Sequence, residues 1–221
     1  MKTKHVLHAA VLLASIALPL AAGSITTTFA DNNRFTGNMF NAVIGANGIT
    51  VNSLDVNVGT GSLTIDVFIK TGTYVGFDTN SAAWTLVSTT AVTGAGAGKS
   101  TLVNVTPFTL KAATTYGIYV TVATNSNSAP YMYYTNGNNT YSNSNLTLDL
   151  GIGLGGEFGS LAVDDDRTWD GTINYSLVSS VPEPTSLGLL AFAALFAQIL
   201  IRSANPIFAR RSKRINPNAI F

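Results

Sequence analysis

The sequence predicts an all-β fold, an antiparallel β-sandwich of jelly-roll-like type, with a closed barrel as the alternative. Three observations lead to this prediction. Apolar and polar residues alternate in several short segments, which is the period of a half-buried strand. Clusters of Gly, Asn and Ser separate these segments, and such residues are typical of turns. Away from the two ends of the chain, no window has a sustained helical period. Many short strands joined by polar turns are typical of sandwiches.

The clearest predicted strand covers residues 63–70, where Leu63, Ile65 and Val67 occupy alternate positions. Similar patterns predict further strands at residues 54–58, 84–87, 102–105, 116–122, 146–152 and 173–177. The Gly-rich stretch 94–98 is predicted to be a flexible hairpin loop. It is not a phosphate-binding P-loop, because Thr93 stands where that pattern requires glycine.

The N-terminal residues 1–23 are predicted to be a secretory signal peptide. Lys2 and Lys4 precede an apolar stretch over residues 9–20, and small residues follow at positions 21–23. A basic start, a short apolar segment and small residues at the cleavage site define such leaders. Cleavage after Ala22 or Gly23 is expected, so the chain is predicted to be exported.

The C-terminal residues have three parts, beginning with a proline motif. Val181, Pro182, Glu183 and Pro184, followed by Thr185, can continue neither a strand nor a helix, so an extended tether is expected there. An apolar run over residues 187–201 follows, and it is predicted to be a single transmembrane helix. At the helical rise it spans roughly 22 Å of a hydrocarbon core of about 30 Å.

The third part is a basic cluster that would hold the last residues in the cytoplasm. Its members are Arg202, Arg210, Arg211, Lys213 and Arg214. Arg202 interrupts the apolar run early, but its long side chain can reach the membrane interface.

These three parts, in this order, resemble the PEP-CTERM sorting signal of Gram-negative bacteria that make exopolysaccharide. The resemblance covers residues 181–214 and implies recognition by an exosortase, a membrane enzyme that resembles a cysteine transpeptidase. It also implies anchoring in the inner membrane, followed by release to the cell surface or extracellular matrix if the tail is processed. Seven residues follow the basic cluster where family members usually end. An ordinary C-terminal membrane anchor is the alternative.

The predicted organisation is therefore a signal peptide (1–23), an extracytoplasmic β-sandwich domain (24–180) and a sorting signal (181–221). The sorting signal comprises the motif 181–185, the membrane helix 187–201 and a basic tail 202–221. Several stretches of the central domain resemble an uncharacterised β-sandwich domain that PEP-CTERM proteins often carry. These stretches are residues 70–76, 83–86, 115–120, 134–137 and 169–173. This second resemblance implies no known activity.

Composition excludes several kinds of function for the central domain. It contains five basic and ten acidic residues, a net charge of −5, which gives nucleic-acid binding no electrostatic support. The chain has no Cys, and its two histidines, His5 and His8, lie in the predicted leader. Ser-His-Asp and Cys-His catalysis, histidine bases and ordinary zinc sites are thereby excluded from the domain. We expect a protein with no catalytic residues and no cofactor; a carbohydrate-active or calcium-dependent enzyme that uses aspartates is the alternative.

Two clusters of side chains are candidates for binding. Tyr131, Tyr133, Tyr134 and Tyr141 lie among Asn and Thr residues, and aromatic rings beside amides can contact sugars; tyrosine is also simply a good strand residue. Asp164, Asp165 and Asp166, with Glu157 and Asp170 nearby, could offer oxygen ligands to calcium; the alternative is a solvated acidic loop.

The sequence thus predicts an exported, structural or adhesive protein of the cell surface or exopolysaccharide matrix. The more specific prediction is that this protein contacts glycans. Its predicted partners are the exosortase, the inner membrane and exopolysaccharide. Ice binding is a third class, because similar tails occur on some ice-binding proteins and threonines are plentiful, as in Thr26–Thr28. Ice-binding faces need a regular Thr array, and no repeat of fixed period is visible.

Overall fold

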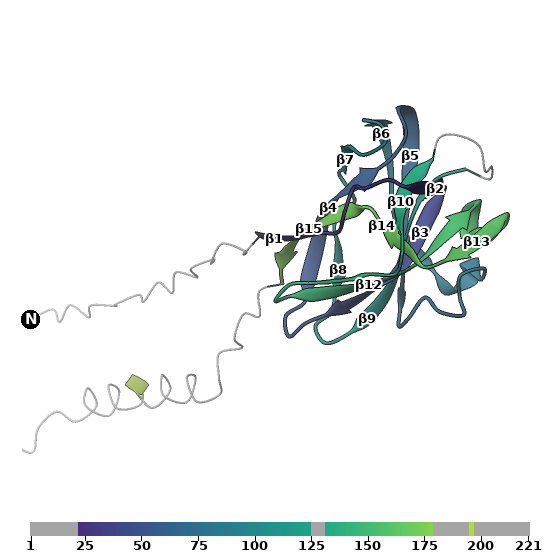
Figure 1. Cartoon of the computed structure of the whole chain (residues 1–221). Coiled ribbons are helices and arrows are strands. Elements are labelled where there is room, and N and C mark those ends of the chain that lie inside the picture. Colours follow the sequence, from purple (N-terminus) through teal and green to yellow (C-terminus); the bar gives the residue numbers. More distant parts are fainter. Residues whose placement is uncertain (1–21, 125–130, 179–194, 197–221) are drawn as a thin grey trace, which may run out of the picture. The chain divides into compact units, whose positions relative to one another are not determined.

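The computed structural model describes residues 22–124, 131–178 and 195–196 of the 221-residue chain (Figure 1). Contacts between residues divide the chain into two units, one ending at Ser179 and the other beginning at Ser180. Residues 22–124 and 131–178 of the first unit are called the body below. The body consists of β-strands and two single-turn 3-10 helices, and every pair of named strands is antiparallel. The predicted all-β, antiparallel fold is confirmed.

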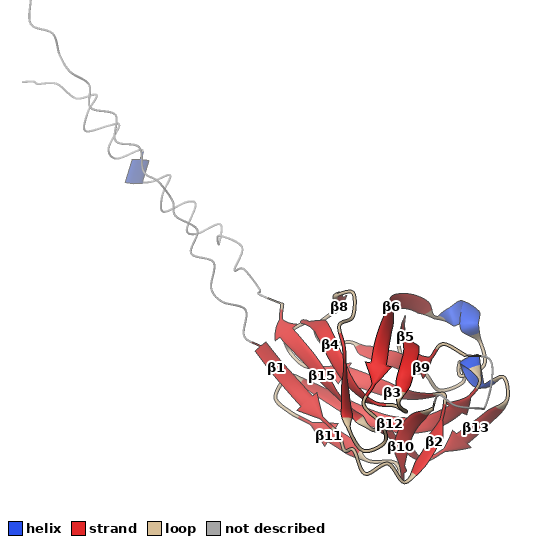
Figure 2. Cartoon of the chain, turned by 90° about the horizontal axis from the view of Figure 1, so that it is seen from above, coloured by secondary structure: helices blue, strands red, loops and turns tan. Residues whose placement is uncertain are grey.

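The strands of the body form three sheets (Figure 2). The five-stranded sheet has the order β1 (Ala22–Thr26), β15 (Gly171–Leu177), β4 (Ile49–Asn57), β7 (Ser100–Val103), with β8 (Phe108–Leu110) also paired to β4. The seven-stranded sheet has the order β11 (Thr140–Ser142), β12 (Leu146–Gly155), β3 (Gly37–Ile44), β9 (Thr115–Val122), β5 (Gly61–Thr71), β6 (Thr85–Gly94), with β13 (Ala162–Asp165) also paired to β12. The small sheet has the order β14 (Arg167–Trp169), β10 (Met132–Asn136), β2 (Asn33–Phe35). The 3-10 helices are η1 (Ser81–Ala83) and η2 (Glu157–Gly159).

The main hydrophobic core lies between the two larger sheets, which makes the body a β-sandwich. Buried residues of β4, including Leu54 and Val56, belong to the same cluster as Ile65 and Val67 of β5. The alternation over residues 63–70 therefore has the predicted cause, because one face of β5 is turned into this core.

A second, smaller core covers the opposite face of the seven-stranded sheet. Met39, Phe68 and Tyr119 contribute to it from three neighbouring strands, and Trp84 and Phe158 cover them. The ring of Phe158 lies 5.0 Å from that of Phe68 and 5.1 Å from that of Tyr119, measured between centroids. Aromatic rings at these separations attract each other beyond their loss of water-exposed area.

Strand β3 is buried on both faces because it lies between these two cores. Met39 faces the second core and Phe40 faces the main one, so apolar residues follow one another without alternation. No strand is predicted over residues 37–44, since the period of two disappears where both faces are covered.

The small sheet lies at one end of the sandwich. Val58, directly after β4, forms a bridge to Met132 of β10, and the ring of Trp169 stacks on Phe40 at 5.0 Å. Met132, Tyr134 and Trp169 are completely buried, so this sheet adds its apolar face to the interior.

The two ends of the body lie side by side. Strands β1 and β15 pair with Ala22 opposite Ser176 and Thr26 opposite Thr172. At the strand rise, the seven residues of β15 carry the chain roughly 20 Å from Gly171 to Leu177. The end of the sandwich that holds Ala22 and Leu177 is called the terminal end below, and the end that holds Gly171 is called the distal end (Figures 1 and 2).

The Gly-rich stretch 94–98 is not the loop of a hairpin, so that prediction is wrong. Strand β6 ends at Gly94 in the seven-stranded sheet, whereas β7 begins at Ser100 in the five-stranded sheet. The stretch therefore crosses from one sheet to the other. Glycine clusters predict that the chain turns, but they do not tell which sheet the next strand joins.

Among the described residues, no helix is long and apolar enough to cross a membrane. The predicted signal peptide up to residue 21 and the predicted membrane helix, apart from Leu195 and Phe196, lie outside the described residues.

Replacing Gly94 by alanine is expected to lower the free energy of unfolding by about 1–3 kcal/mol, because the added methyl group would overlap the carbonyl oxygen of Gly59. Backbone atoms cannot move aside as a flexible side chain can. Gly59→Ala is the matched control, since its methyl group would meet nothing closer than the Tyr131 nitrogen at 3.7 Å. Urea denaturation of both variants measures the difference, and equal stability of the two variants would contradict the close approach.

Candidate functional site

The four tyrosines proposed for glycan contact lie in different surroundings. Tyr131 and Tyr133 are half-buried, whereas Tyr134, between the core and β14, is completely buried. Tyr134 therefore cannot offer its ring to a polysaccharide in solution. Tyr141 lies on β11 in the seven-stranded sheet and packs against the main core, so it does not share a surface strand with Tyr131 and Tyr133. Only Tyr131 and Tyr133 remain together as surface candidates.

A small hollow lies beside Tyr133, where β2 pairs with β10. Asp31, Asn32, Asn33, Arg34 and Tyr133 line a volume of about 220 Å³. Tyr133 stands directly opposite Arg34 in the strand pair. The hollow thus combines a carboxylate, a guanidinium, two amides and a phenol ring within four consecutive residues and one neighbouring strand.

Arg34 is held over the ring of Tyr131, with Cζ 4.5 Å from the ring centroid. This is the geometry of a cation–π contact. The ion pair found among the described residues joins Arg167 to Asp164 and does not involve Arg34. The donors of Arg34 therefore remain available to a bound molecule.

The amides of the hollow are partly engaged by the neighbouring strand. Asn32 Oδ1 accepts a hydrogen bond from the backbone nitrogen of Asn136 at 2.7 Å, and Asn33 Nδ2 donates to Asn136 Oδ1 at 3.1 Å. Asn33 Oδ1 also accepts from the Arg34 nitrogen at 2.8 Å. These bonds fix both side chains and leave the Asn32 amide nitrogen as a donor toward the hollow.

Beneath the hollow lies Asp170, a carboxylate that is completely buried. Its Oδ2 accepts hydrogen bonds from the backbone nitrogen of Asp31 at 3.0 Å and from Asn57 Nδ2 at 3.3 Å, and its Oδ1 accepts one from Thr135 Oγ1 at 2.9 Å. All three donors are neutral. Asp170 therefore joins the segment before β2, the end of β4 and strand β10 at one point.

Burial raises the pKa of Asp170 to about 6, because a charged carboxylate loses its hydration there. The three hydrogen bonds lower the pKa and so oppose this effect, while the negative charge of Asp31 adds to it. The buried charge is thus only partly compensated.

Two further backbone features lie beside Asp170. Asp31 adopts φ of 50°, in the left-handed region that residues other than glycine rarely occupy. The Gly98 nitrogen donates to Asn57 Oδ1 at 2.9 Å, so the same network fixes the Gly-rich crossing between β6 and β7. The distal end of the sandwich is therefore organised around Asp170.

The acidic residues proposed for calcium do not form a common site. Asp164 pairs with Arg167 at 3.1 Å, and Asp165 and Asp166 are exposed and contribute their backbone oxygens, not their carboxylates, to Arg167. Within the described part of the chain, no three Asp, Glu, His or Cys side chains lie close enough to hold a metal ion. Alternation along β13 turns Asp164 and Asp165 in opposite directions, and the calcium site is not supported.

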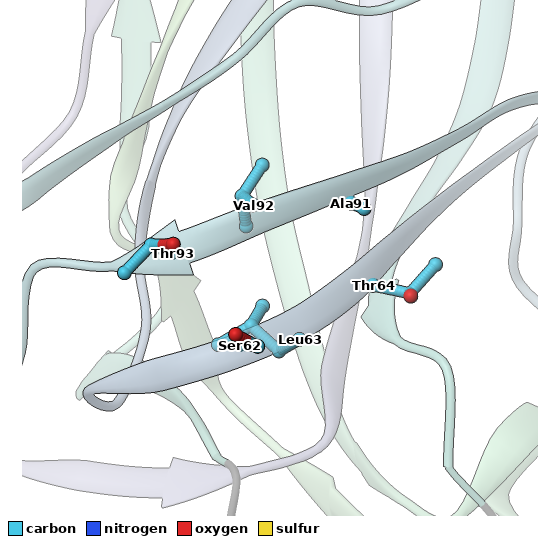
Figure 3. Close-up of a pocket in the computed structure, with 6 residues that line it drawn as sticks. All are labelled: Ser62, Leu63, Thr64, Ala91, Val92 and Thr93. Carbon is cyan, nitrogen blue, oxygen red and sulfur yellow. The ribbon is translucent and has the colours of Figure 1, made fainter.

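Two other hollows of the body offer less chemistry. One, of about 400 Å³, lies on the β5–β6 pair and is lined by Ser62, Leu63, Thr64, Ala91, Val92 and Thr93 (Figure 3). Its side chains carry only methyl groups and hydroxyls. The other, of about 420 Å³, lies beside η2 and has one charged residue, Glu157.

Apart from Leu195 and Phe196, the residues of the predicted sorting signal lie outside the described residues. The hollow itself is not predicted from the sequence, because Asp31, Asn32 and Asn33 look like ordinary turn residues. Nothing in the local sequence indicates that Asp170, which is 139 positions away, reaches them.

No family model matches the chain, and no curated protein is similar enough to count as a relative. Among solved structures, the chain is similar to the crystal structure of the infectious bursal disease virus VP2 subviral particle, at 14% identity and a TM-score of 0.26, with 87% of this chain and 54% of that one covered. A structure of the infectious bursal disease virus Gx strain is similar at 16% identity and a TM-score of 0.25, with 89% and 54% covered. The chain spans about half the length of these structures. TM-scores this low support no conclusion about its function.

Proposed function

We propose that this protein is exported, is sorted by a PEP-CTERM signal, and serves as a structural or adhesive component of the cell surface or exopolysaccharide matrix. In this proposal residues 1–23 direct export and residues 187–201 anchor the tail in the inner membrane. An exosortase recognises Pro182, Glu183 and Pro184. The sandwich has jelly-roll-like connections and contacts glycans.

The observation that carries the proposal is the order of motif, apolar run and basic cluster at residues 181–214. The position of the terminal strands is compatible with it. Because Ala22 lies opposite Ser176, a leader and a tail would both leave from the terminal end. Within the body, Tyr131, Tyr133 and Arg34 lie at the distal end.

A role without catalysis is supported by the surroundings of the aspartates. A glycosidase needs two carboxyl groups that both reach the substrate. Asp170 has a raised pKa, as a catalytic acid would, but it is completely buried and does not line the hollow. Both of its oxygens already accept hydrogen bonds from the protein. We therefore prefer a binding role to the aspartate-enzyme alternative.

Ice binding remains the third class and gains no support from the threonines singled out above. The hydroxyl of Thr27 donates to the backbone oxygen of Trp169 at 2.6 Å, so it points into the protein. Thr26 bonds to Thr172 across the strand pair.

The test is the location of the protein in the bacterium that produces it. We expect the unchanged chain at the cell surface or in the matrix, and Glu183→Ala in the inner membrane, because the recognised motif is lost. Glu157→Ala is the matched control, since Glu157 is the only other glutamate in the chain. The same location for the Glu183→Ala variant and the unchanged protein would contradict sorting by this motif.

A further inference from the structure

We propose that the hollow lined by Asp31, Asn32, Arg34 and Tyr133 binds one sugar ring of a neutral, hydroxyl-rich saccharide. This inference rests on the proposed function and names the ligand class of its distal end. The polar groups that such a ligand needs are present in this one hollow.

The groups that face the hollow match the chemistry of a sugar. Each sugar hydroxyl both donates and accepts, so a site needs acceptors and donors side by side. Asp31 supplies carboxylate acceptors, while Arg34 and the Asn32 amide supply donors. The Tyr133 ring supplies an apolar face for the C–H groups of the ring.

Size and charge narrow the ligand class. A hollow of about 220 Å³ is smaller than the roughly 300–1,000 Å³ of pockets for drug-sized ligands, and it suits a single ring. One carboxylate and one guanidinium leave the lining with no net charge. The domain around it carries −5, which disfavours a polyanionic ligand.

The hollow is also held in shape before any ligand arrives. Arg34 is stacked on Tyr131, Asn32 and Asn33 are bonded to Asn136, and the Asp31 nitrogen is bonded to the buried Asp170. Fixed side chains lose less entropy when a ligand binds. An incompletely compensated buried carboxylate and a left-handed Asp31 both cost stability, and such costs concentrate at functional sites.

The experiment is calorimetric titration of the full chain with neutral hexose oligosaccharides of the cello, malto, manno and galacto series. The protein is kept in a detergent without a sugar headgroup. We expect at least one oligosaccharide to bind with a Kd of about 1 mM or below. Tyr133→Ala is expected to weaken that binding about tenfold, the size of one aromatic contact.

Asp31→Asn is the more specific test. Asparagine tolerates the left-handed backbone, so this substitution removes only the charge of the acceptor. It is expected to weaken binding about tenfold, whereas Tyr141→Ala on β11 is expected to leave it unchanged. Thermal melting of each variant shows that it is folded.

Three results would overturn the inference. They are no binding of any of these oligosaccharides at about 10 mM, binding that is unaffected by both Tyr133→Ala and Asp31→Asn, and tighter binding of hexagalacturonate than of every neutral sugar. None of them bears on the location of the Glu183→Ala variant, so failure here is distinguishable from failure of the proposed sorting.

Discussion

Trp169→Ala is expected to lower the free energy of unfolding by about 3–5 kcal/mol, a large share of the 5–15 kcal/mol typical of a domain. Trp169 is completely buried, and its ring stacks on Phe40 with 18° between the ring planes. Its removal leaves a cavity between the small sheet and the main core. Gly171 packs directly against the ring, so its backbone would line that cavity.

Trp169→Phe separates ring packing from the indole nitrogen. Nε1 of Trp169 is buried without a hydrogen-bond partner among the described residues, so losing it costs no hydrogen bond. We expect the phenylalanine variant to be much more stable than the alanine variant in urea denaturation. Equal destabilisation by the two substitutions would contradict the account of this packing.

The second large effect is a pH dependence of stability that comes from Asp170. Its pKa is about 6 in the folded protein, against 3.8 for the ordinary side chain. The folded state therefore holds this proton more tightly than the unfolded state does. Well below pH 3.8 both states are protonated and the contribution is fully favourable. As the pH rises through 3.8 and then through 6, stability falls by about 3 kcal/mol in all, and it stays low above about pH 7.

Asp170→Asn is expected to remove this dependence. The amide oxygen can accept from the Asp31 and Asn57 nitrogens, and the amide nitrogen can donate to the Thr135 hydroxyl, so all three contacts survive without a charge. The variant should be more stable than the unchanged protein at pH 7 and similar to it at pH 4. Asp170→Ala is the contrast, because it leaves those donors unpaired and should destabilise at both values.

Denaturation curves at pH 4, 5, 6 and 7 measure this difference. Parallel loss of stability in the unchanged protein and Asp170→Asn would mean that other groups cause the pH dependence. The effect of these substitutions also concerns the shape of the hollow, because Asp170 accepts a hydrogen bond from the Asp31 nitrogen and so holds that backbone in place.

The strands whose residues alternate clearly could be predicted from the sequence, and strands without such alternation could not. The alternation over residues 63–70 locates β5 because its opposite positions meet different surroundings. Strand β3 has no such contrast, since Met39 and Phe40 are both buried. The short strands β2 and β14 have too few residues to show a period.

The candidate site could be predicted only in part. Tyr131 and Tyr133 stand out as aromatic residues among amides, and they do lie near the hollow. Arg34 does not stand out, and Asp170 stands out only as a neighbour of the acidic cluster considered for calcium. Their place at the hollow comes from pairing between β2, β10 and the segment before β15. Tyr134 looks equivalent to Tyr133 in the sequence, yet strand alternation turns it into the core.

The most direct test of the account is the intact mass of the protein recovered from the bacterium that produces it. The proposed sorting predicts a chain that begins after Ala22 or Gly23 and lacks the residues beyond the Pro182–Pro184 motif. A chain that retains every residue to Phe221 in the inner membrane would contradict it, and would leave residues 187–201 as a plain anchor.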